Sequence, residues 1–404
     1  MKDWKEYRIK DLGEVITGNT PPTSNREYYG TEYKFIKPTD MVEGQRFVPT
    51  TEEYYSELAY QKYKKCLLPP KTPCVVTIGS LGKKMCLTDT ECFTNQAVNA
   101  VIPNKQNDGE FLYYAFKASV LAYVKQLDSG TTSGRENVSK SSFSKIKVRV
   151  PSLPTQKKIA SILSAYDNLI QNYKKQIEAL QTAASELYKE WFVRFRFPGY
   201  QTTKFENGIP EGWKVGRLSN YCKITDGTHD TPLQVEEGIP LVTGKSVKKG
   251  EIDFSIPYNI SIEDHEKIKK RSGLKTGDIL FSNIGTVGNS CLVEYDREFS
   301  VKNMIIFKPE TIEKSMYLYY LITSDSCQQL FSAQTNGSTQ QFLGLDFMRN
   351  FKILVPENPI ISEFGKKQEV IYAKIRNLRK QITNLTQQRD LLLPRLMSGK
   401  LEVE

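Results

Sequence analysis

The sequence predicts a mixed α/β protein in which one unit occurs twice, each copy followed by a long helix. Short motifs recur in the same order at offsets of 205 to 209 residues. Each copy then ends in a pattern of apolar residues at steps of three and four, which is typical of a coiled-coil helix. Because a pseudo-twofold axis would relate two such copies, we expect the two helices to pack antiparallel on each other.

Seven collinear matches indicate duplication of half the chain. The recurring anchors include Trp4-Lys5 and Trp213-Lys214, Thr17-Gly18 and Asp226-Gly227, Gly79-Ser80-Leu81-Gly82 and Gly285-Thr286-Val287-Gly288, Tyr113-Tyr114 and Tyr319-Tyr320, and Val150-Pro151 and Val355-Pro356. We therefore expect globular domains over residues 1–150 and 210–358. Long helices are expected over 151–196 and, with a C-terminal tail, over 359–404, and a linker over 197–209.

The overall composition supports two folded domains. At 404 residues the chain is long enough for two cores, and its 39% hydrophobic residues are too many for a disordered protein. Its formal charge of +10 attracts polyanions, so nucleic acid or an acidic partner is expected.

Within each copy the pattern is one of short strands bounded by glycine and proline. Strands are predicted over residues 73–78, 147–150 and 278–281, and helices over 110–125 and 315–331. Each copy is thus expected to have a mostly β core with a few helices.

The heptad pattern begins after Pro154 and continues for almost five heptads, longer than a buried core helix usually sustains it. In the second helix Arg389 occupies a seam position, and Pro394 is expected to end the helix. About 35 residues at a rise of about 1.5 Å form a rod of about 50 Å, comparable to about 15 base pairs. The predicted seam residues are Ile159, Leu163, Tyr166, Ile170, Tyr173, Ile177, Leu180, Ala184, Leu187 and Trp191 in the first helix, and Ile371, Ile375, Leu378, Ile382 and Leu385 in the second.

Metal, redox and membrane functions have little support. The seven cysteines include no C-x-x-C spacing and are interpreted as reduced thiols, and the two histidines, His229 and His265, as surface or turn residues. No apolar stretch approaches a bilayer span, and the opening Met1-Lys2-Asp3-Trp4 lacks a signal-peptide core, so a cytoplasmic protein is expected.

The sequence contains no complete cofactor-binding motif. Gly244-Lys245-Ser246 resembles the end of a phosphate-binding loop, but Ile239 stands where the first glycine is required. Asn19-Thr20-Pro21-Pro22 departs from the signature of adenine methyltransferases. No cofactor, no metal and no catalytic residue is expected.

Three stretches resemble the DNA-specificity subunits of Type I restriction-modification systems. They are residues 150–160, Trp191-Phe192-Val193, and residues 391–401, of which the last is the most specific. The resemblance covers essentially the whole chain, although residues 356–364 depart from the family pattern and Gly365 follows them. It implies two target-recognition domains that read the two parts of an asymmetric bipartite site on double-stranded DNA. It also implies that the helices space these domains and dock adenine-methylating modification subunits, two per chain, with restriction subunits as further candidate partners.

Two kinds of segment are candidate DNA contacts in each copy: a polar loop and a glycine turn. Hydroxyl, amide and guanidinium groups can bond base edges or phosphates, and a bare glycine backbone admits a phosphate. The alternatives are an ordinary polar surface loop and a turn with no further role. The candidate residues are Lys83, Lys84, Thr131, Thr132, Ser133, Arg135, Asn137, Asn289, Ser338, Thr339, Gln340 and Gln341.

Two other classes of protein remain as alternatives. A scaffold could use its helical seams to bind protein partners without reading DNA. A DNA methyltransferase with a diverged site would bind its cofactor as an isolated chain.

Overall fold

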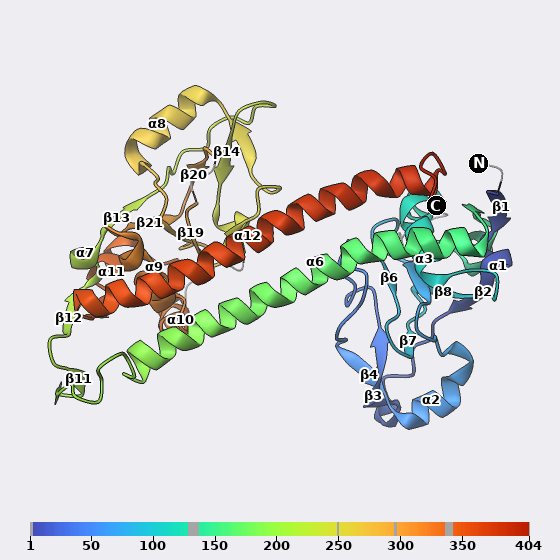
Figure 1. Cartoon of the computed structure of the whole chain (residues 1–404), viewed down its shortest axis with the longest axis horizontal. Helices are drawn as coiled ribbons and strands as arrows, with labels where there is room; N and C mark the ends of the chain where they lie inside the picture. Colours follow the sequence, from blue (N-terminus) through green and yellow to red (C-terminus); the bar gives the residue numbers. More distant parts are fainter. Residues whose placement is uncertain (1–2, 128–136, 249, 295–296, 336–341, 404) are drawn as a thin grey trace. The chain divides into compact units, whose positions relative to one another are not determined.

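The computed structural model describes residues 3–127, 137–248, 250–294, 297–335 and 342–403. The chain forms two compact units (Figure 1). Unit 1 contains residues 1–174 and 379–404, and unit 2 contains residues 175–378. Each unit therefore includes part of both long helices, and the domain boundaries drawn from the sequence remain predictions.

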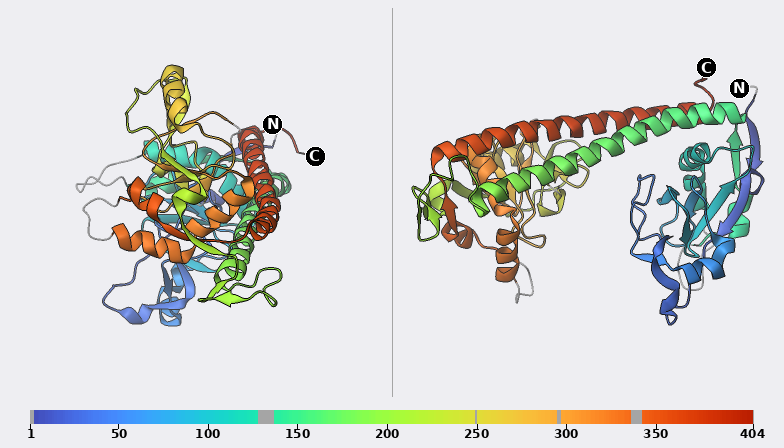
Figure 2. Two further views of the ribbon diagram at one scale, coloured as in Figure 1. Left: turned by 90° about the vertical axis from the view of Figure 1, so that its left-hand side faces the viewer. Right: turned by 60° about the horizontal axis from the view of Figure 1, so that its bottom comes forward.

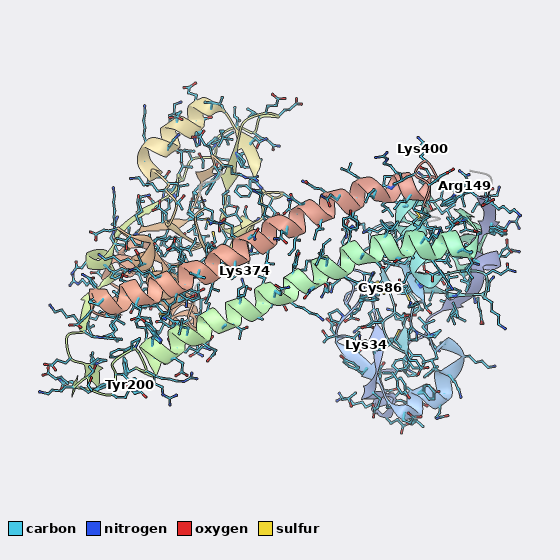
Figure 3. All side chains as sticks on the ribbon, viewed as in Figure 1. Lys34, Cys86, Arg149, Tyr200, Lys374 and Lys400 are labelled. Carbon is cyan, nitrogen blue, oxygen red and sulfur yellow. The ribbon has the colours of Figure 1, made fainter. Side chains whose placement is uncertain are left out.

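Unit 1 is built on two small sheets and a strand pair. One sheet has the order β2-β8-β5-β6, the other β4-β3-β7, and β1 pairs with β9. Lys34 and Cys86 lie on different sheets of this unit (Figure 3). The strands are β1 (Lys5–Arg8), β2 (Gly13–Thr17), β3 (Tyr29–Ile36), β4 (Glu53–Tyr55), β5 (Pro73–Val76), β6 (Met85–Leu87), β7 (Cys92–Thr94), β8 (Val98–Pro103) and β9 (Lys147–Val150). The shorter helices are α1 (Ile9–Leu12), η1 (Arg26–Tyr28), α2 (Glu57–Tyr63), η2 (Lys64–Cys66), α3 (Gly109–Ala115), η3 (Phe116–Val120), α4 (Leu121–Gln126) and α5 (Lys140–Lys145).

Unit 2 repeats this topology strand for strand. Its sheets have the orders β13-β21-β18-β19 and β17-β14-β20, and β12 pairs with β22, while β10-β11 and β15-β16 are additional pairs. The strands are β10 (Phe205–Glu206), β11 (Ile209–Pro210), β12 (Lys214–Arg217), β13 (Lys223–Asp226), β14 (Ile239–Val242), β15 (Val247–Lys248), β16 (Glu251–Ile252), β17 (Tyr258–Ile260), β18 (Ile279–Phe281), β19 (Ser290–Leu292), β20 (Ser300–Val301), β21 (Ile305–Lys308) and β22 (Lys352–Val355). The shorter helices are α7 (Leu218–Tyr221), η5 (Gly244–Ser246), α8 (Ile262–Ser272), α9 (Ile312–Ile322), α10 (Asp325–Thr335) and α11 (Leu345–Asn350). The predicted duplication and mixed α/β class are confirmed.

The helix predicted over residues 110–125 is present as the continuous run α3-η3-α4, capped by Asp108, whose carboxylate accepts the Phe111 amide at 2.9 Å. The helix predicted over residues 315–331 is instead two helices, α9 and α10. The break lies at Ser324, whose hydroxyl donates to the Leu321 carbonyl at 2.6 Å and accepts the Cys327 amide at 3.4 Å. A serine that caps the next helix in this way competes with continuation of the first.

Two long helices accompany the sheets: α6 (Leu153–Tyr188), continued by η4 (Lys189–Val193), and α12 (Asn358–Met397). The expectation that Pro394 ends the second helix is wrong, because Pro394 lies inside α12. Proline removes one backbone hydrogen bond, but Leu393 and Leu396 on the same turn are buried in the core of unit 1, which offsets that loss.

The long helices run antiparallel within each unit, side by side in the views of Figure 2. In unit 1, Arg389 meets Asp167, and Leu396 shares a core with Ile159. In unit 2, the ring of Phe364 lies 4.8 Å from that of Phe192, and the Gln368 side chain donates to the Ala184 carbonyl at 2.9 Å. None of the residues predicted for the seam is exposed: Ile159, Leu163, Ile170, Trp191, Ile375 and Leu378 are buried, and Tyr166, Tyr173, Ile177, Leu180, Leu187, Ile371, Ile382 and Leu385 are half-buried.

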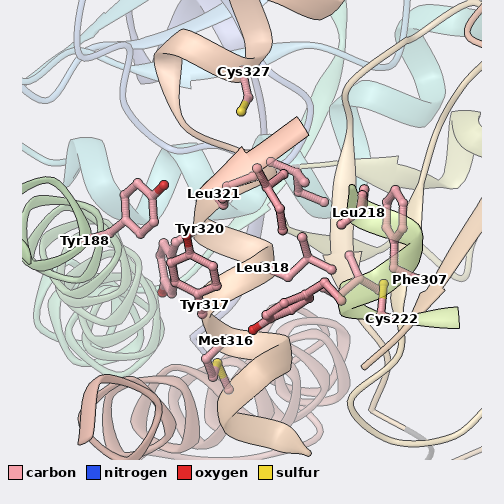
Figure 4. Packing of buried hydrophobic residues seen from close by; sticks show 14 of the residues in the cluster. Tyr188, Leu218, Cys222, Phe307, Met316, Tyr317, Leu318, Tyr320, Leu321 and Cys327 are labelled. Atoms are coloured by element: carbon pink, nitrogen blue, oxygen red, sulfur yellow. The ribbon is translucent and has the colours of Figure 1, made fainter. Parts of the chain in front are cut away.

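In the core of unit 2, aromatic rings join the long helix α6 to α9 of the globular part. Tyr188 of α6 lies beside Tyr317 and Tyr320 of α9 (Figure 4), with ring centroids 6.2 and 6.5 Å away. The globular part of unit 2 is thus packed directly on its segment of the long helices. None of the described helices is long and apolar enough to cross a membrane.

Candidate nucleic-acid interface

The same edge of the four-stranded sheet gathers separated loops in both units. In unit 1, Thr17 at the end of β2 pairs with Asn99 near the start of β8, and Val76 at the end of β5 pairs with Val98. The loops that follow β2 and β5 and the loop that precedes β8 therefore leave the sheet at one edge. We call residues 17–20, 77–84 and 95–97 the loop edge of unit 1.

The equivalent edge exists in unit 2. Asp226 at the end of β13 pairs with Ile305 at the start of β21, which also pairs with Phe281 at the end of β18. Residues 226–230, 282–289 and 302–304 form the loop edge of unit 2. Strand pairing alone thus builds the same platform from two sequences that share few residues.

Both glycine turns lie on these edges. Gly79 and Gly82 have φ angles of 85° and 71°, and Gly285 and Gly288 have 74° and 97°. These left-handed conformations favour glycine. No described atom lies within 4 Å of the position that a Cβ would occupy at Gly79 or Gly285, so the backbone there is open to an approaching ligand.

Each glycine turn is fastened to the end of the polar loop. In unit 1, Ile78 forms an isolated β-bridge with Asn137, and the Val138 amide donates to the Thr77 carbonyl at 2.8 Å. In unit 2, Ile284 forms the equivalent bridge with Phe342. The structure therefore places Asn137, the last residue of the unit 1 polar loop, and Phe342, which follows the unit 2 polar loop in sequence, beside the glycine turns. Of the polar-loop candidates, half-buried Asn137 is described, whereas Thr131, Thr132, Ser133, Arg135, Ser338, Thr339, Gln340 and Gln341 lie outside the described residues.

The three candidate side chains on the glycine turns differ in their exposure and in their hydrogen bonds. Lys83 is exposed on the turn. Lys84 is half-buried and donates to the Pro38 carbonyl at 2.8 Å, which ties the turn to the loop after β3. Asn289 is exposed, but its amide donates to the Val247 carbonyl at 3.2 Å. Lys83 is thus the basic side chain of the first turn best placed to meet a phosphate.

The structure adds a histidine that the sequence interpretation left without a role. The His229 Nε2 atom lies 2.8 Å from Oδ2 of Asp226, and its Nδ1 atom lies 2.9 Å from Oδ1 of Asn303. The guanidinium of Arg271 bonds Oδ1 of the same Asp226 at 2.6 Å. The sequence contains one signal of this site: at the offset of 209 residues between the two copies, His229 corresponds to Thr20. In unit 1 the hydroxyl of Thr20 bonds Gln96.

These contacts shift the pKa values of His229 and Asp226. Hydrogen bonds to Asn303 and to the Asp226 carboxylate raise the pKa of His229 above its usual value. Burial alone would raise the pKa of Asp226, but hydrogen bonds from Arg271 and His229 hold it below its usual range. The charged forms of both groups are therefore favoured in the fold.

The interpretation of His265 as a surface or turn residue is wrong. It lies on α8, is 1% exposed, and its Nδ1 atom is 2.9 Å from Oγ of Ser300. Lys267, Lys269 and Lys270 lie on the same short helix, which therefore has a charged face and a buried one. Among the described residues, no group of three His, Cys, Asp or Glu side chains is arranged to hold a metal.

The chain is similar to known DNA-specificity proteins in both copies. The family model described as the Type I restriction modification DNA specificity domain matches residues 1–182 and 210–393. The MjaIX specificity subunit of a Type I restriction enzyme from Methanocaldococcus jannaschii is 29% identical over all of this chain and 94% of its own length. The HindI specificity subunit from Haemophilus influenzae is 36% identical over 42% of this chain and 38% of its own length.

A solved structure supports the fold. The S subunit of a Type I restriction-modification system from M. genitalium matches 98% of this chain and 96% of its own, with a TM-score of 0.62 and 18% identity.

Proposed function

The chain belongs to the Type I restriction-modification DNA-specificity family, and from this membership we propose that its two units read the two parts of an asymmetric bipartite site on double-stranded DNA. As a specificity subunit it is non-catalytic, and the catalytic activity of such systems lies in other subunits.

The observation that carries this proposal is the repeated loop edge. Both units present a glycine turn on the same sheet edge, bridged to Asn137 in unit 1 and to Phe342 in unit 2, while the side chains on that edge differ between the units. Unit 1 pairs the neutral Thr20 with Gln96 on its loop edge, whereas unit 2 pairs His229 with Asn303. One scaffold with two different sets of donors and acceptors suits the reading of two different base sequences.

We also propose that the long helices dock adenine-methylating modification subunits, two per chain, and that restriction subunits join the same complex. Apolar side chains exposed on these helices support this: Ile162, Leu169 and Leu391 in unit 1 and Val370 in unit 2. In unit 1 a groove of about 570 Å³ lies between the start of α6 and the end of α12, lined by Ile162, Leu392 and Leu396 among others. The proposal places the complex in the cytoplasm, in contact with genomic DNA.

Methylome sequencing tests the function directly. Cells that carry this chain and a modification subunit should methylate adenines within one bipartite motif, and cells with the modification subunit alone should not. Absence of any motif that depends on this chain would contradict the proposal.

Two binding measurements separate the alternatives. A complex with its modification subunit that binds no DNA would favour a protein-binding scaffold. Binding of S-adenosylmethionine by the isolated chain would favour a diverged methyltransferase.

A further inference from the structure

We propose that His229 and Asn303 form a proton-controlled specificity switch on the loop edge of unit 2: protonated His229 makes Asn303 offer a hydrogen-bond donor to DNA, and neutral His229 makes it offer an acceptor. This inference rests on the proposed function, because it requires the loop edge to face DNA. It assigns a specificity-determining role to His229 and Asn303 and predicts which bases each protonation state prefers.

The first step is the hydrogen-bond pattern around the imidazole. The Nε2 atom of His229 faces a carboxylate oxygen of Asp226, and its Nδ1 atom faces the carbonyl oxygen of the Asn303 side chain. In this orientation of the carboxamide both partners are acceptors, so both ring nitrogens donate, which only the imidazolium form can do.

The second step concerns Asn303. While its Oδ1 atom accepts from the imidazolium, the Nδ2 amide has no hydrogen-bond partner among the described residues. When His229 loses the Nδ1 proton, that nitrogen becomes an acceptor. A rotation of the carboxamide then places Nδ2 against His229 and leaves Oδ1 to accept from a ligand.

The third step is that the backbone holds this arrangement in place. Asn303 has a φ angle of 51°, which asparagine tolerates better than most residues. The backbone N–H of Asn303 donates to the Thr228 carbonyl at 3.0 Å, and the backbone N–H of Thr228 donates to the Val301 carbonyl at 2.9 Å. Because these backbone hydrogen bonds hold the two loops together, protonation of His229 can reorient the Asn303 carboxamide without moving the backbone.

Hydrogen bonds to Asn303 and to Asp226, together with the charge of Asp226, raise the pKa of His229 above the ordinary histidine range. Asp226 on β13 faces Nε2, and Arg271 at the end of α8 shares that carboxylate and partly opposes its effect. Asp230 lies on the same loop as His229, and Lys302 precedes Asn303 and bonds Thr231. The side chain of His229 is 61% exposed, whereas that of Asp226 is 11% exposed, so the imidazole lies at the surface above a largely buried carboxylate.

Base chemistry fixes the direction of the switch. In the major groove guanine presents two acceptors, N7 and O6, whereas adenine and cytosine present an amino donor. The donor state of Asn303 therefore favours a base that presents acceptors, guanine or thymine, and the acceptor state favours adenine or cytosine, which present an amino group. Unit 1 has no equivalent, because Thr20 and Gln96 do not titrate near neutral pH.

The test uses the full chain assembled with its modification subunits. Binding to duplexes with a randomised site is selected and sequenced at pH 6.0 and at pH 8.5. We expect the ratio of guanine to adenine at one position of one half-site to fall by about tenfold as the pH rises, while the other half-site keeps its preference.

Two variants sharpen the test. His229→Thr, which introduces the residue of unit 1, should abolish the pH dependence, and Asn303→Asp, which offers only acceptors, should favour the amino bases at both pH values. Thr20→Ser in unit 1 is the matched control and should leave the pH response unchanged.

The outcomes are separable. A wild-type complex whose sequence preference is independent of pH, or a pH response that survives in His229→Thr, overturns the switch and leaves the DNA-reading function intact. A complex without sequence preference at either pH overturns the proposed function itself. Retention of a sequence preference at both half-sites in each variant shows that both units are folded.

Discussion

Asp167 on α6 and Arg389 on α12 form a buried ion pair, with 2.6 Å between Oδ1 of Asp167 and Nη1 of Arg389. Each side chain is only 10% exposed. The second oxygen of Asp167 accepts from the hydroxyl of Tyr114 at 2.6 Å, and Arg46 donates to the same hydroxyl at 3.3 Å. The pair therefore ties both long helices to the globular part of unit 1. In unit 2 the junction with the globular part is made by aromatic rings instead, and the Gln368 side chain joins α12 to α6.

Removal of one partner should cost much more than removal of both. Arg389→Ala leaves a carboxylate buried without its counter-charge, so we expect unit 1 to lose about 3–5 kcal/mol of unfolding free energy. The double variant Asp167→Leu with Arg389→Met should lose less than about 1 kcal/mol, since the buried charges leave together. Urea denaturation of the wild type, Asp167→Leu, Arg389→Met and the double variant measures the coupling, and Arg389→Ala is measured beside them.

The exposed pair of Asp346 and Arg349 is the matched control for this cycle. Asp346 is 91% exposed, and Arg349→Ala should change stability by less than about 0.5 kcal/mol. Equal losses in Arg389→Ala and Arg349→Ala would show that the buried pair contributes no more than a surface pair.

Gly227 should be irreplaceable for the loop edge of unit 2. A Cβ at this position would overlap the carbonyl oxygen of Val301, and the same holds for Gly18 and the carbonyl of Thr94 in unit 1. Gly227→Ala should therefore cost about 1–3 kcal/mol and weaken binding to the unit 2 half-site. Gly216→Ala is the control, because its Cβ would meet only Val355 Cγ2 at 3.9 Å. Indistinguishable melting temperatures of the two variants would refute this close approach.

The thiols should be protected in the native protein. All seven cysteines are free, six are buried and Cys66 is half-buried. Burial raises the pKa of Cys222 to about 12, so at pH 8 roughly one molecule in ten thousand carries its thiolate. Ellman's reagent at pH 8 should modify Cys66 first and the others only on unfolding. Rapid reaction of several thiols in the native state would contradict the buried positions.

The sequence could predict what depends on repetition and periodicity. The offset motifs revealed the duplication, and the heptad pattern revealed both long helices, because each signal is carried by the chain itself. The helix end at Pro394 and the single helix over residues 315–331 were wrong, since core packing by Leu396 and capping by Ser324 decided them. These are tertiary and local hydrogen-bonding effects that a periodicity does not record.

The candidate site could be predicted from the sequence only in part, for a related reason. The polar loops and glycine turns could be named from composition, but their joining depends on bridges such as Ile78 with Asn137. The pairing of His229 with Asn303 joins residues 74 positions apart and follows from strand register. A single sequence contains no local signal of that register.

Lys83 and Lys84 should respond differently to mutation, although both were predicted as phosphate contacts. Lys83→Ala should weaken binding to all DNA sequences and reduce the slope of log affinity against log salt by about 0.9. Lys84→Ala should leave the slope unchanged and instead lower stability, because Lys84 already donates to the Pro38 carbonyl. Fluorescence anisotropy with labelled duplexes over a salt series measures both effects.

The exposed Lys174 on α6 is the control for this series. Lys174→Ala should leave affinity and slope unchanged. A change of base preference in Lys83→Ala, rather than a uniform loss, would assign Lys83 to base contact instead.

The length of the long helices should set the gap between the two half-sites. Seven residues inserted after Lys174 in α6 and seven after Leu378 in α12 preserve the heptad register of both helices and add about 10 Å to each. Methylome sequencing should then return the same two half-sites with a gap longer by about three base pairs. An insertion in α6 alone leaves the helices unequal, so it should reduce methylation rather than move the gap. An unchanged gap in the double insertion would refute the role of the helices as spacers, whereas loss of methylation in the double insertion but normal folding would show that docking of the modification subunits also depends on helix length.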